Sequence, residues 1–360
     1  MKDTMTDAMP AVEVRGLAKH YGPVRALDGV DVTIQAGEYF VLLGPSGGGK
    51  TTLLRTIGGF HRPTAGTVRL HGQDVSDLPP EKRPTGMVFQ QYALFPHMTV
   101  ERNVGYGLSL QKRPKSEISD KVSTMLDQVG LSGLSGRKPH ELSGGQQQRV
   151  QLARALVLDR DILLLDEPLA ALDAQLRKDM CLELKHLQEQ VGVTFIHVTH
   201  NQEEAMTVAN RIALIADGKL VEHGTAQQIY EAPRQRFTAS FVGENNLIPG
   251  TVLNAEPPNA TIETGAGAIS VACEELVRAG DKVTFSIRSE LVSIGPEDGA
   301  GIPATHAESV YLGLTTSHRV HLADGTEIVS RVLSSNGPSP EPGTPVTVSW
   351  PQDGARLHLD

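Results

Sequence analysis

The segment that most constrains this chain is a glycine-rich loop between an apolar run and a predicted helix. Residues 44–51 read GPSGGGKT, which fits the pattern G-x-x-x-x-G-K-[ST]. Tyr39–Leu43 is predicted as a buried parallel strand before the loop, and residues 51–57 as a helix after it. Glycines let backbone N–H groups close around phosphate oxygens, and the N-terminus of a helix adds partial positive charge. The sequence therefore predicts a site for ATP or GTP.

Two side chains complete the expected phosphate site. Lys50 would reach the β- and γ-phosphates, and Thr51 would hold Mg²⁺. The alternative is a flexible loop without a ligand, but it leaves the preceding strand, the following helix and the Lys-Thr pair unexplained. The loop alone does not indicate what purpose nucleotide hydrolysis serves.

Charge and apolar content restrict the partners and the compartment. The formal charge of −9, from 42 acidic and 33 basic residues, disfavours broad nucleic-acid binding because a phosphate backbone needs a basic face. No apolar stretch is long enough to cross a bilayer, and residues 1–10 lack a signal-peptide core, so we expect a cytoplasmic protein. Cys181 and Cys273 are isolated, which indicates neither a disulfide nor a zinc site.

The pattern of elements predicts two domains within the 360 residues. Residues 1–244 combine apolar strands with helices, and about 91–160 contain helices without strands, as expected of a separate lobe. From residue 245 to 360 the chain has short β-rich runs separated by Gly/Pro turns. We therefore expect an α/β domain followed by an all-β domain in which no catalytic group is recognisable.

Polar side chains follow three predicted strands of the first domain. The apolar run Ile162–Asp166 ends in Asp166 and is followed by Glu167, and paired acids at a strand end are costly to bury without a partner or a metal. With the glycine-rich loop upstream, Asp166 is the expected Mg²⁺ ligand and Glu167 a candidate general base for water. Gln90 and His200 also follow strands and would lie at the same edge of the sheet, although a Gln there is often an ordinary loop residue.

Two further features are suggestive only in combination. Ser143, Gly144 and Gly145 precede a predicted helix, which makes an anion cradle at a helix N-terminus, although taken alone such a segment is more often a plain turn. Tyr21 lies upstream of the glycine-rich loop and could stack on a nucleotide base, but a single Tyr more often contributes to packing.

Taken in order, these segments resemble the ATP-binding subunit of an ABC transporter. The resemblance implies an α/β P-loop nucleotide-binding domain, with a RecA-like mixed sheet, antiparallel β-structure and a helical subdomain, followed by a C-terminal all-β domain of the OB or TOBE type. The matching motifs are Walker A at 44–51, the Q-loop at Gln90, the signature at 142–146, Walker B at Ile162–Asp166 with Glu167, the D-loop at 171–173 and the H-loop at His200.

The resemblance also implies a role for each motif residue. Catalysis would fall to Lys50, Glu167 and His200, and Mg²⁺ would be held by Thr51, Gln90 and Asp166. Contacts to the chain's own ATP would come from Tyr21, Gly44, Pro45, Ser46, Gly47, Gly48, Gly49, Lys50, Thr51, Thr52 and Gln90. Contacts in trans, to the ATP of a second copy, would come from Ser143, Gly144, Gly145, Gln146 and Asp173. The protein would thus act as a dimer of cassettes.

Two positions depart from the commonest strings of the family. Gly48 replaces a bulkier residue often found in the loop, and Asn201 replaces the Asp that often follows the H-loop His. Neither position carries a donor or acceptor that we regard as essential, so we expect only fine adjustments of the site.

The second domain narrows the resemblance to importers. Residues 285–290 (FSIRSE) resemble the I-R-P-E string of TOBE-type regulatory domains, with Ser289 where Pro is usual. Residues 241–246 are most like spermidine/putrescine importers, whereas ferric-iron and 2-aminoethylphosphonate importers share nearly all the same strings. The resemblance implies a peripheral ATPase on the cytoplasmic face of the inner membrane that energises solute uptake through permease subunits and, indirectly, a periplasmic or extracellular solute-binding protein.

Two other classes remain as alternatives. A soluble ABC protein of DNA repair would need a long coiled coil between Thr51 and Ser143, which the sequence lacks, and translation members usually carry two cassettes. A different P-loop enzyme, such as a small-molecule kinase, would not need the signature at 142–146.

The loop makes a direct prediction for nucleotide binding. Replacing Lys50 with Ala removes the ammonium that would contact the β- and γ-phosphates, so we expect a loss of ATP affinity, measured by isothermal titration calorimetry. Lys112→Ala, outside every motif, is the control. Equal affinity of the Lys50→Ala variant and the wild type would refute the proposed phosphate loop.

Overall fold

The computed structural model describes residues 9–90, 93–256, 258–265, 267–273, 277–299, 301–334 and 339–359. The chain packs as two compact units, Met1–Ala226 and Gln227–Asp360. Each unit has its own apolar core. In the part of the chain that the structure describes, no helix combines the length and the apolar character needed to cross a bilayer.

The first unit is built on a six-stranded sheet in which all but one strand are parallel. Its central strands are fully buried, as expected where apolar runs such as YFVLL and ILLLD lie inside a parallel sheet covered on both faces. The strand order is β10 (Lys219–Gly224), β9 (Arg211–Ala216), β3 (Tyr39–Leu43), β8 (Thr194–Val198), β7 (Ile162–Asp166) and β6 (Thr85–Val88).

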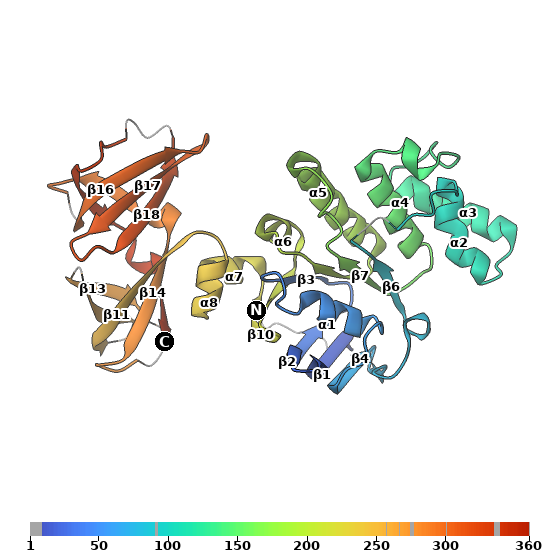
Figure 1. Ribbon diagram of the computed structural model, residues 1–360, viewed down its shortest axis with the longest axis horizontal. Coiled ribbons are helices and arrows are strands. Elements are labelled where there is room, and N and C mark those ends of the chain that lie inside the picture. The colour runs from blue at the N-terminus through green and yellow to red at the C-terminus, as the bar shows by residue number, and fades with distance from the viewer. Residues whose placement is uncertain are drawn as a thin grey trace, which may run out of the picture. The chain divides into compact units, whose positions relative to one another are not determined.

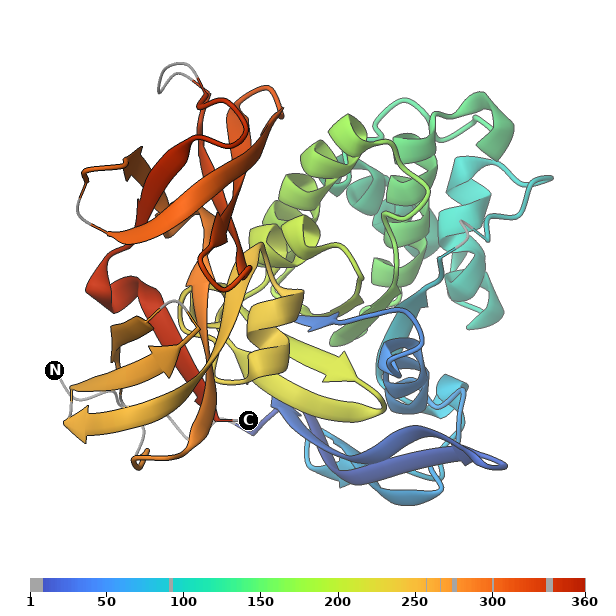
Figure 2. The ribbon, with the colours of Figure 1, turned by 60° about the vertical axis from the view of Figure 1, so that its left-hand side comes forward.

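An antiparallel sheet forms a second layer, coloured blue in Figure 2. Its order is β2 (Val24–Ile34), β1 (Val12–Tyr21), β4 (Ala65–Leu70) and β5 (Gln73–Asp74). Leu53 and Ile57 of helix α1 (Lys50–Ile57) belong to one apolar core together with residues of both sheets. The helix that follows the glycine-rich loop is therefore held firmly by packing on both sides.

The remaining helices of this unit fall into two groups (Figure 1). Helices α2 (Val100–Leu110), α3 (Lys115–Gln128) and α4 (Gly144–Leu156) pack together as a helical lobe. This lobe falls within the range expected from the sequence, about 91–160, whose first residue, Gln91, lies outside the described residues. Helices α5 (Ala174–Val191) and α6 (Gln202–Val208) follow strands β7 and β8 and pack against each other.

The second unit is all-β apart from helices α7 (Ala226–Glu231) and α8 (Arg236–Phe241) and short 3-10 turns, within the residues described. Two five-stranded antiparallel sheets share one core. The first is β13 (Gly267–Ala272), β12 (Asn259–Thr264), β11 (Asn245–Glu256), β14 (Lys282–Arg288) and β20 (Ala355–Leu359). The second is β15 (Ser293–Pro296), β19 (Pro345–Ser349), β16 (Ile302–Tyr311), β17 (Thr315–Leu322) and β18 (Glu327–Leu333).

Residues 227–244, which the sequence pattern placed in the first domain, pack with the second unit. The buried Arg288 explains this. Its guanidinium donates hydrogen bonds to the backbone carbonyls of Tyr230 and Val242 and lies 4.0 Å from the centroid of the Tyr230 ring. The packing therefore divides the chain after Ala226, before the boundary at 244/245 that the sequence predicts. The boundary at 244/245 stays a prediction for the end of the nucleotide-binding module.

The unusual Ser289 also contributes to this junction. Its backbone N–H donates to the carbonyl of Glu244 at 3.0 Å, and its hydroxyl donates to the Glu244 carboxylate at 2.9 Å. A Pro, which is usual at this position of the I-R-P-E string, has no N–H to donate. The departure thus adds two hydrogen bonds that hold residue 244 against the first residues of the loop after β14.

A buried arginine secures the C-terminal end of α1. Arg83 is 1% exposed, and its guanidinium donates to the carbonyls of Thr56 (2.9 Å), Ile57 (2.8 Å) and Leu78 (2.8 Å). Carbonyls at a helix C-terminus have no partner within the helix. Arg83 supplies those partners and so anchors the helix that carries Lys50 and Thr51.

The Arg83 contacts predict a specific loss of stability. Arg83→Met would remove the guanidinium donor from three carbonyls, of which that of Thr56 still accepts from the backbone N–H of Gly59 at 3.2 Å. We therefore expect the free energy of unfolding to fall by about 2–4 kcal/mol, measured by urea denaturation. The exposed Arg69→Met is the matched control, with a change within about 0.5 kcal/mol. Equal stability of the two variants would show that the Arg83 contacts do not stabilise the helix.

Candidate nucleotide-binding site

The glycine-rich loop joins β3 to α1 in a conformation that only glycine adopts without strain at key positions. Gly49, the N-cap of α1, has a φ of 107°, and a Cβ there would lie 2.6 Å from the carbonyl oxygen of Ala26. A Cβ on Gly44 would lie 2.0 Å from the carbonyl oxygen of Ile215. The loop backbone is therefore free to curl at the N-terminus of the helix, where unpaired N–H groups favour phosphate oxygens.

The same packing bears on the departure at position 48. A Cβ on Gly48 would lie 2.8 Å from the carbonyl oxygen of Ile215 and 3.1 Å from that of Pro45. A bulkier residue at this position would require the segment at Ile215 to shift. The glycine therefore fits the closely packed loop of this chain.

Lys50 lies inside the loop with its ammonium group largely shielded from solvent. The Nζ atom donates to the carbonyl oxygens of Gly44 and Pro45, each at 2.8 Å. Burial lowers the pKa of Lys50, while the nearby carboxylates of Glu167 and Asp166 raise it. An ammonium group has three donors, so Lys50 retains one for a phosphate oxygen while two fix its position.

Thr51 and Asp166 provide oxygen atoms beside the loop. The Thr51 hydroxyl donates to Asp166 Oδ1 at 3.0 Å, and Arg55 forms an ion pair with Asp166 Oδ2 at 3.1 Å. A hydroxyl and a carboxylate next to a phosphate site match the hard oxygen ligands that Mg²⁺ prefers. The two residues therefore fit the expected metal. Arg55 was not anticipated, although its position four residues after Thr51 places both side chains on one face of α1.

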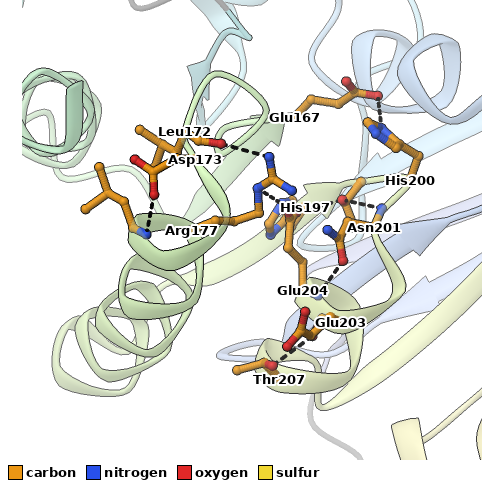
Figure 3. A network of polar contacts seen from close by, with 12 residues as sticks. Glu167, Leu172, Asp173, Arg177, His197, His200, Asn201, Glu203, Glu204 and Thr207 are labelled. Atoms are coloured by element: carbon orange, nitrogen blue, oxygen red, sulfur yellow. Dashed lines mark hydrogen bonds and ion pairs between the residues drawn. The ribbon is translucent and has the colours of Figure 1, made fainter. Parts of the chain in front are cut away.

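Three strand ends bring Gln90, Glu167 and His200 together. Gln90 Nε2 donates to Glu167 Oε2 at 3.0 Å, and His200 Nδ1 lies 3.3 Å from Glu167 Oε1. Figure 3 shows the contact between Glu167 and His200. The amide of Gln90 contacts Glu167, whereas the resemblance assigned it to Mg²⁺. Glu167 has a φ of 47°, a left-handed conformation that is costly for this residue type and common at functional sites.

The residues expected to act in trans cap two helices of their own chain. Ser143 Oγ accepts from the backbone N–H of Gln146 at 3.3 Å, and Gln146 Oε1 accepts from that of Ser143 at 3.0 Å, which forms a capping box at α4. Asp173 Oδ1 accepts from the backbone N–H of Leu176 at 2.9 Å at the start of α5. Both helix N-termini are thereby fixed in conformation.

Tyr21 lies at the end of β1 with its side chain open to solvent. The residue is 45% exposed, and its ring makes an edge contact with His61 at a centroid distance of 6.0 Å. The Lys19 ammonium lies 5.0 Å from the ring centroid. An exposed aromatic ring of this kind is available for stacking on a base.

Comparison with known proteins identifies the family. The family model described as ABC transporter matches residues 27–170, and the one described as TOBE domain matches residues 285–357. The chain is 45% identical to the spermidine/putrescine import ATP-binding protein PotA of Ruegeria pomeroyi over 357 residues, 97% of each chain. This chain belongs to the ABC transporter family. The PotA of Mesorhizobium japonicum is 46% identical to this ABC protein over 327 residues, 89% of each chain.

Solved structures support the assignment of the first unit of the ABC protein. A dimeric post-hydrolysis state of the ATP-binding cassette MJ0796, bound to ADP and Pi, aligns with a TM-score of 0.53 and 34% identity, covering 60% of this chain and 98% of that one. The cbiO1 protein of Clostridium perfringens, part of an ABC transporter complex, aligns with a TM-score of 0.58 and 28% identity, covering 61% and 90%. The α/β cassette and C-terminal β-domain expected from the sequence are confirmed.

The pair of Thr51 and Asp166 makes a prediction for metal binding. Asp166→Asn keeps the side-chain shape but removes the charge, so we expect the affinity for Mn²⁺, used as a probe for Mg²⁺, to fall at least about 10-fold. The measurement is a titration followed by electron paramagnetic resonance with a non-hydrolysable ATP analogue. Asp161→Asn, at the exposed position directly before the same strand, is the control. Unchanged Mn²⁺ affinity in Asp166→Asn would contradict the assignment.

Proposed function

We propose that this chain is the ATP-hydrolysing subunit of a binding-protein-dependent ABC importer, and that its solute is a polyamine such as spermidine or putrescine. The observation that carries the ATPase role is the position of Glu167 between Gln90 and His200, at the sheet edge that also carries Asp166. The importer role rests on near-full-length similarity to proteins named as import ATP-binding subunits.

In this proposal Glu167 acts as the general base. One of its carboxylate oxygens accepts from Gln90, and the other lies beside His200. An oxygen that accepts such a bond is a weaker base, so loss of the Gln90 contact on nucleotide binding would make Glu167 a stronger base towards water. His200 would then be free to contact the γ-phosphate, and Lys50 would hold the β- and γ-phosphates. Mg²⁺, held by Thr51 and Asp166, would neutralise phosphate charge.

The proposed assembly is a dimer of cassettes. A cassette of this family has been solved as a dimer after hydrolysis, which supports a partnership of two copies. In that arrangement Ser143, Gly145 and Gln146 would contact the partner's ATP from the N-terminus of α4. The cassettes would bind permease subunits on the cytoplasmic face of the membrane, and a solute-binding protein would deliver the solute from the other side.

The choice of a polyamine rests on the names of the relatives. The similar proteins of Ruegeria pomeroyi and Nitrosomonas eutropha, 45% and 44% identical, are both named as spermidine/putrescine import ATP-binding proteins. Ferric iron and 2-aminoethylphosphonate are the alternative solutes. Uptake of radiolabelled spermidine, ferric ion and 2-aminoethylphosphonate by cells producing the wild-type or Glu167→Gln chain would separate the three solutes, because the variant should abolish uptake of the true solute alone.

The general-base assignment predicts a specific kinetic defect. Glu167→Gln keeps the size of the side chain but cannot take a proton, so we expect the rate of ATP hydrolysis to fall by about 10²–10⁴-fold. ATP affinity should persist, as measured by calorimetry. The exposed Glu183→Gln provides a control on helix α5. Hydrolysis at the wild-type rate in Glu167→Gln would show that another group is the base.

A crosslink tests the dimer. In the Glu167→Gln background, one chain carries Ser143→Cys and a second chain carries Ser46→Cys, so that a disulfide reports a contact between copies. The native Cys181 and Cys273 are buried. A crosslink that requires ATP is the expected result. If no crosslink forms in the presence of ATP, a different P-loop enzyme becomes the better interpretation.

A further inference from the structure

A buried carboxylate near the site has no part in the proposed chemistry. Glu204, in the first turn of α6, is 5% exposed, and its Oε2 accepts from the Thr199 hydroxyl at 2.7 Å. Burial raises the pKa of Glu204, while the Thr199 hydrogen bond and the charge of Arg177 lower it. A carboxylate at this depth requires a compensating partner.

Arg177 provides that partner and also contacts the D-loop. Its Nε lies 3.5 Å from Glu204 Oε1, and its Nη2 donates to the carbonyl oxygen of Leu172 at 2.8 Å. Leu172 is the central residue of the D-loop, residues 171–173. One guanidinium from α5 therefore joins the backbone of the D-loop to the carboxylate of α6 (Figure 3).

The carboxylate in turn fixes the turn that carries His200. The Thr199 hydroxyl, which donates to Glu204, accepts from the backbone N–H of Asn201 at 2.9 Å. Asn201 Oδ1 accepts from the backbone N–H of Glu204 at 3.1 Å, as an N-cap of α6. Asn and Asp cap helices about equally well, so the Asn found here keeps this function. Residues on both sides of His200 are thus bound to the same helical turn.

His197 does not supply the compensating charge. Its Nε2 lies 3.8 Å from Glu204 Oε2, and its Nδ1 lies 3.1 Å from the Tyr39 hydroxyl. Complete burial lowers the pKa of His197 to about 3, so the ring is neutral at physiological pH. The ion pair of Glu204 with Arg177 is consequently the charged link in this network.

We propose that Arg177 and Glu204 are positioning residues that hold the D-loop and the His200 turn in one fixed relation. Asp173 of the D-loop is expected to act on the second copy, whereas His200 is expected to act on the chain's own ATP. The link would bring Asp173 and His200 into position at the same time, so that both ATP sites of a dimer become able to hydrolyse ATP together. This inference rests on the proposed function.

The same two helices carry a matched control. Lys178 Nζ lies 2.8 Å from Glu203 Oε1, and both side chains are exposed, at 58% and 63%. This pair also joins α5 to α6, but no contact from it reaches Leu172 or Thr199 among the described residues. If the role of each pair were only to attach α5 to α6, replacing Lys178 and Glu203 would change kcat and the Hill coefficient as much as replacing Arg177 and Glu204.

The experiment compares Arg177→Met, Glu204→Gln, the double variant of both, and the control Lys178→Met/Glu203→Gln. Three quantities are measured on the full chain: urea stability, ATP affinity, and the steady-state ATPase rate as a function of ATP concentration. We expect Arg177→Met to lower kcat about 10- to 100-fold, to leave ATP affinity within about 2-fold, and to reduce the Hill coefficient towards 1.

The double variant separates positioning from charge compensation. Arg177→Met leaves a buried charge unpaired and costs stability, whereas the double variant removes both charges and should recover that stability. If the link positions the loops, the double variant remains slow and non-cooperative. Recovery of kcat and cooperativity together with stability would overturn the proposal, as would an equal loss in the control pair. A wild-type chain that hydrolyses no ATP would instead refute the proposed function, whereas a wild-type chain that hydrolyses ATP without cooperativity would overturn the joint action of the two sites proposed here.

Discussion

The site depends on the common edge at which the parallel strands of the first unit end. In the observed register Asp166 of β7 pairs with Val198 of β8, and Val198 pairs with Leu42 of β3. The residues that follow these strands must therefore emerge side by side, although they are far apart in the chain. Because a shift of one residue in any strand would turn its side chains to the opposite face, the buried cores of β3, β7 and β8 preserve the geometry of the site.

One residue at this edge has a strained backbone conformation, which packing around the site supports. Glu167 has a positive φ, a conformation that is uncommon for a non-glycine residue. Its carboxylate is directed towards Gln90 and His200 by that backbone conformation. Arg83, at the C-terminal end of α1, and the apolar core hold this helix in place. A rigid surrounding of this kind is what allows a strained residue to persist.

Buried charges follow a common pattern in this unit. Lys50 is held by backbone carbonyls, Asp166 by a hydroxyl and an arginine, and Glu204 by a hydroxyl and an arginine. Each charge thus has more than one partner, which offsets the desolvation that burial imposes. The groups around Asp166 and Lys50 can exchange these partners for phosphate or metal. The contacts of Arg177 and Glu204 lead to the D-loop and to the turn that carries His200, which is why we assign them a positioning role.

The sequence by itself determined the loop, the apolar strands, the order of the motifs and the all-β character of the second unit, because these depend on local residue patterns. The sequence also predicts that Gln90, Glu167 and His200 lie close together, because each of them follows a parallel strand. Only the tertiary structure decided that Gln90 contacts Glu167, that Arg55 pairs with Asp166 and that residues 227–244 join the second unit. Such contacts depend on side-chain direction and on long-range packing. Residue spacing indicates that Arg55 shares a face of α1 with Thr51, but not that it pairs with Asp166.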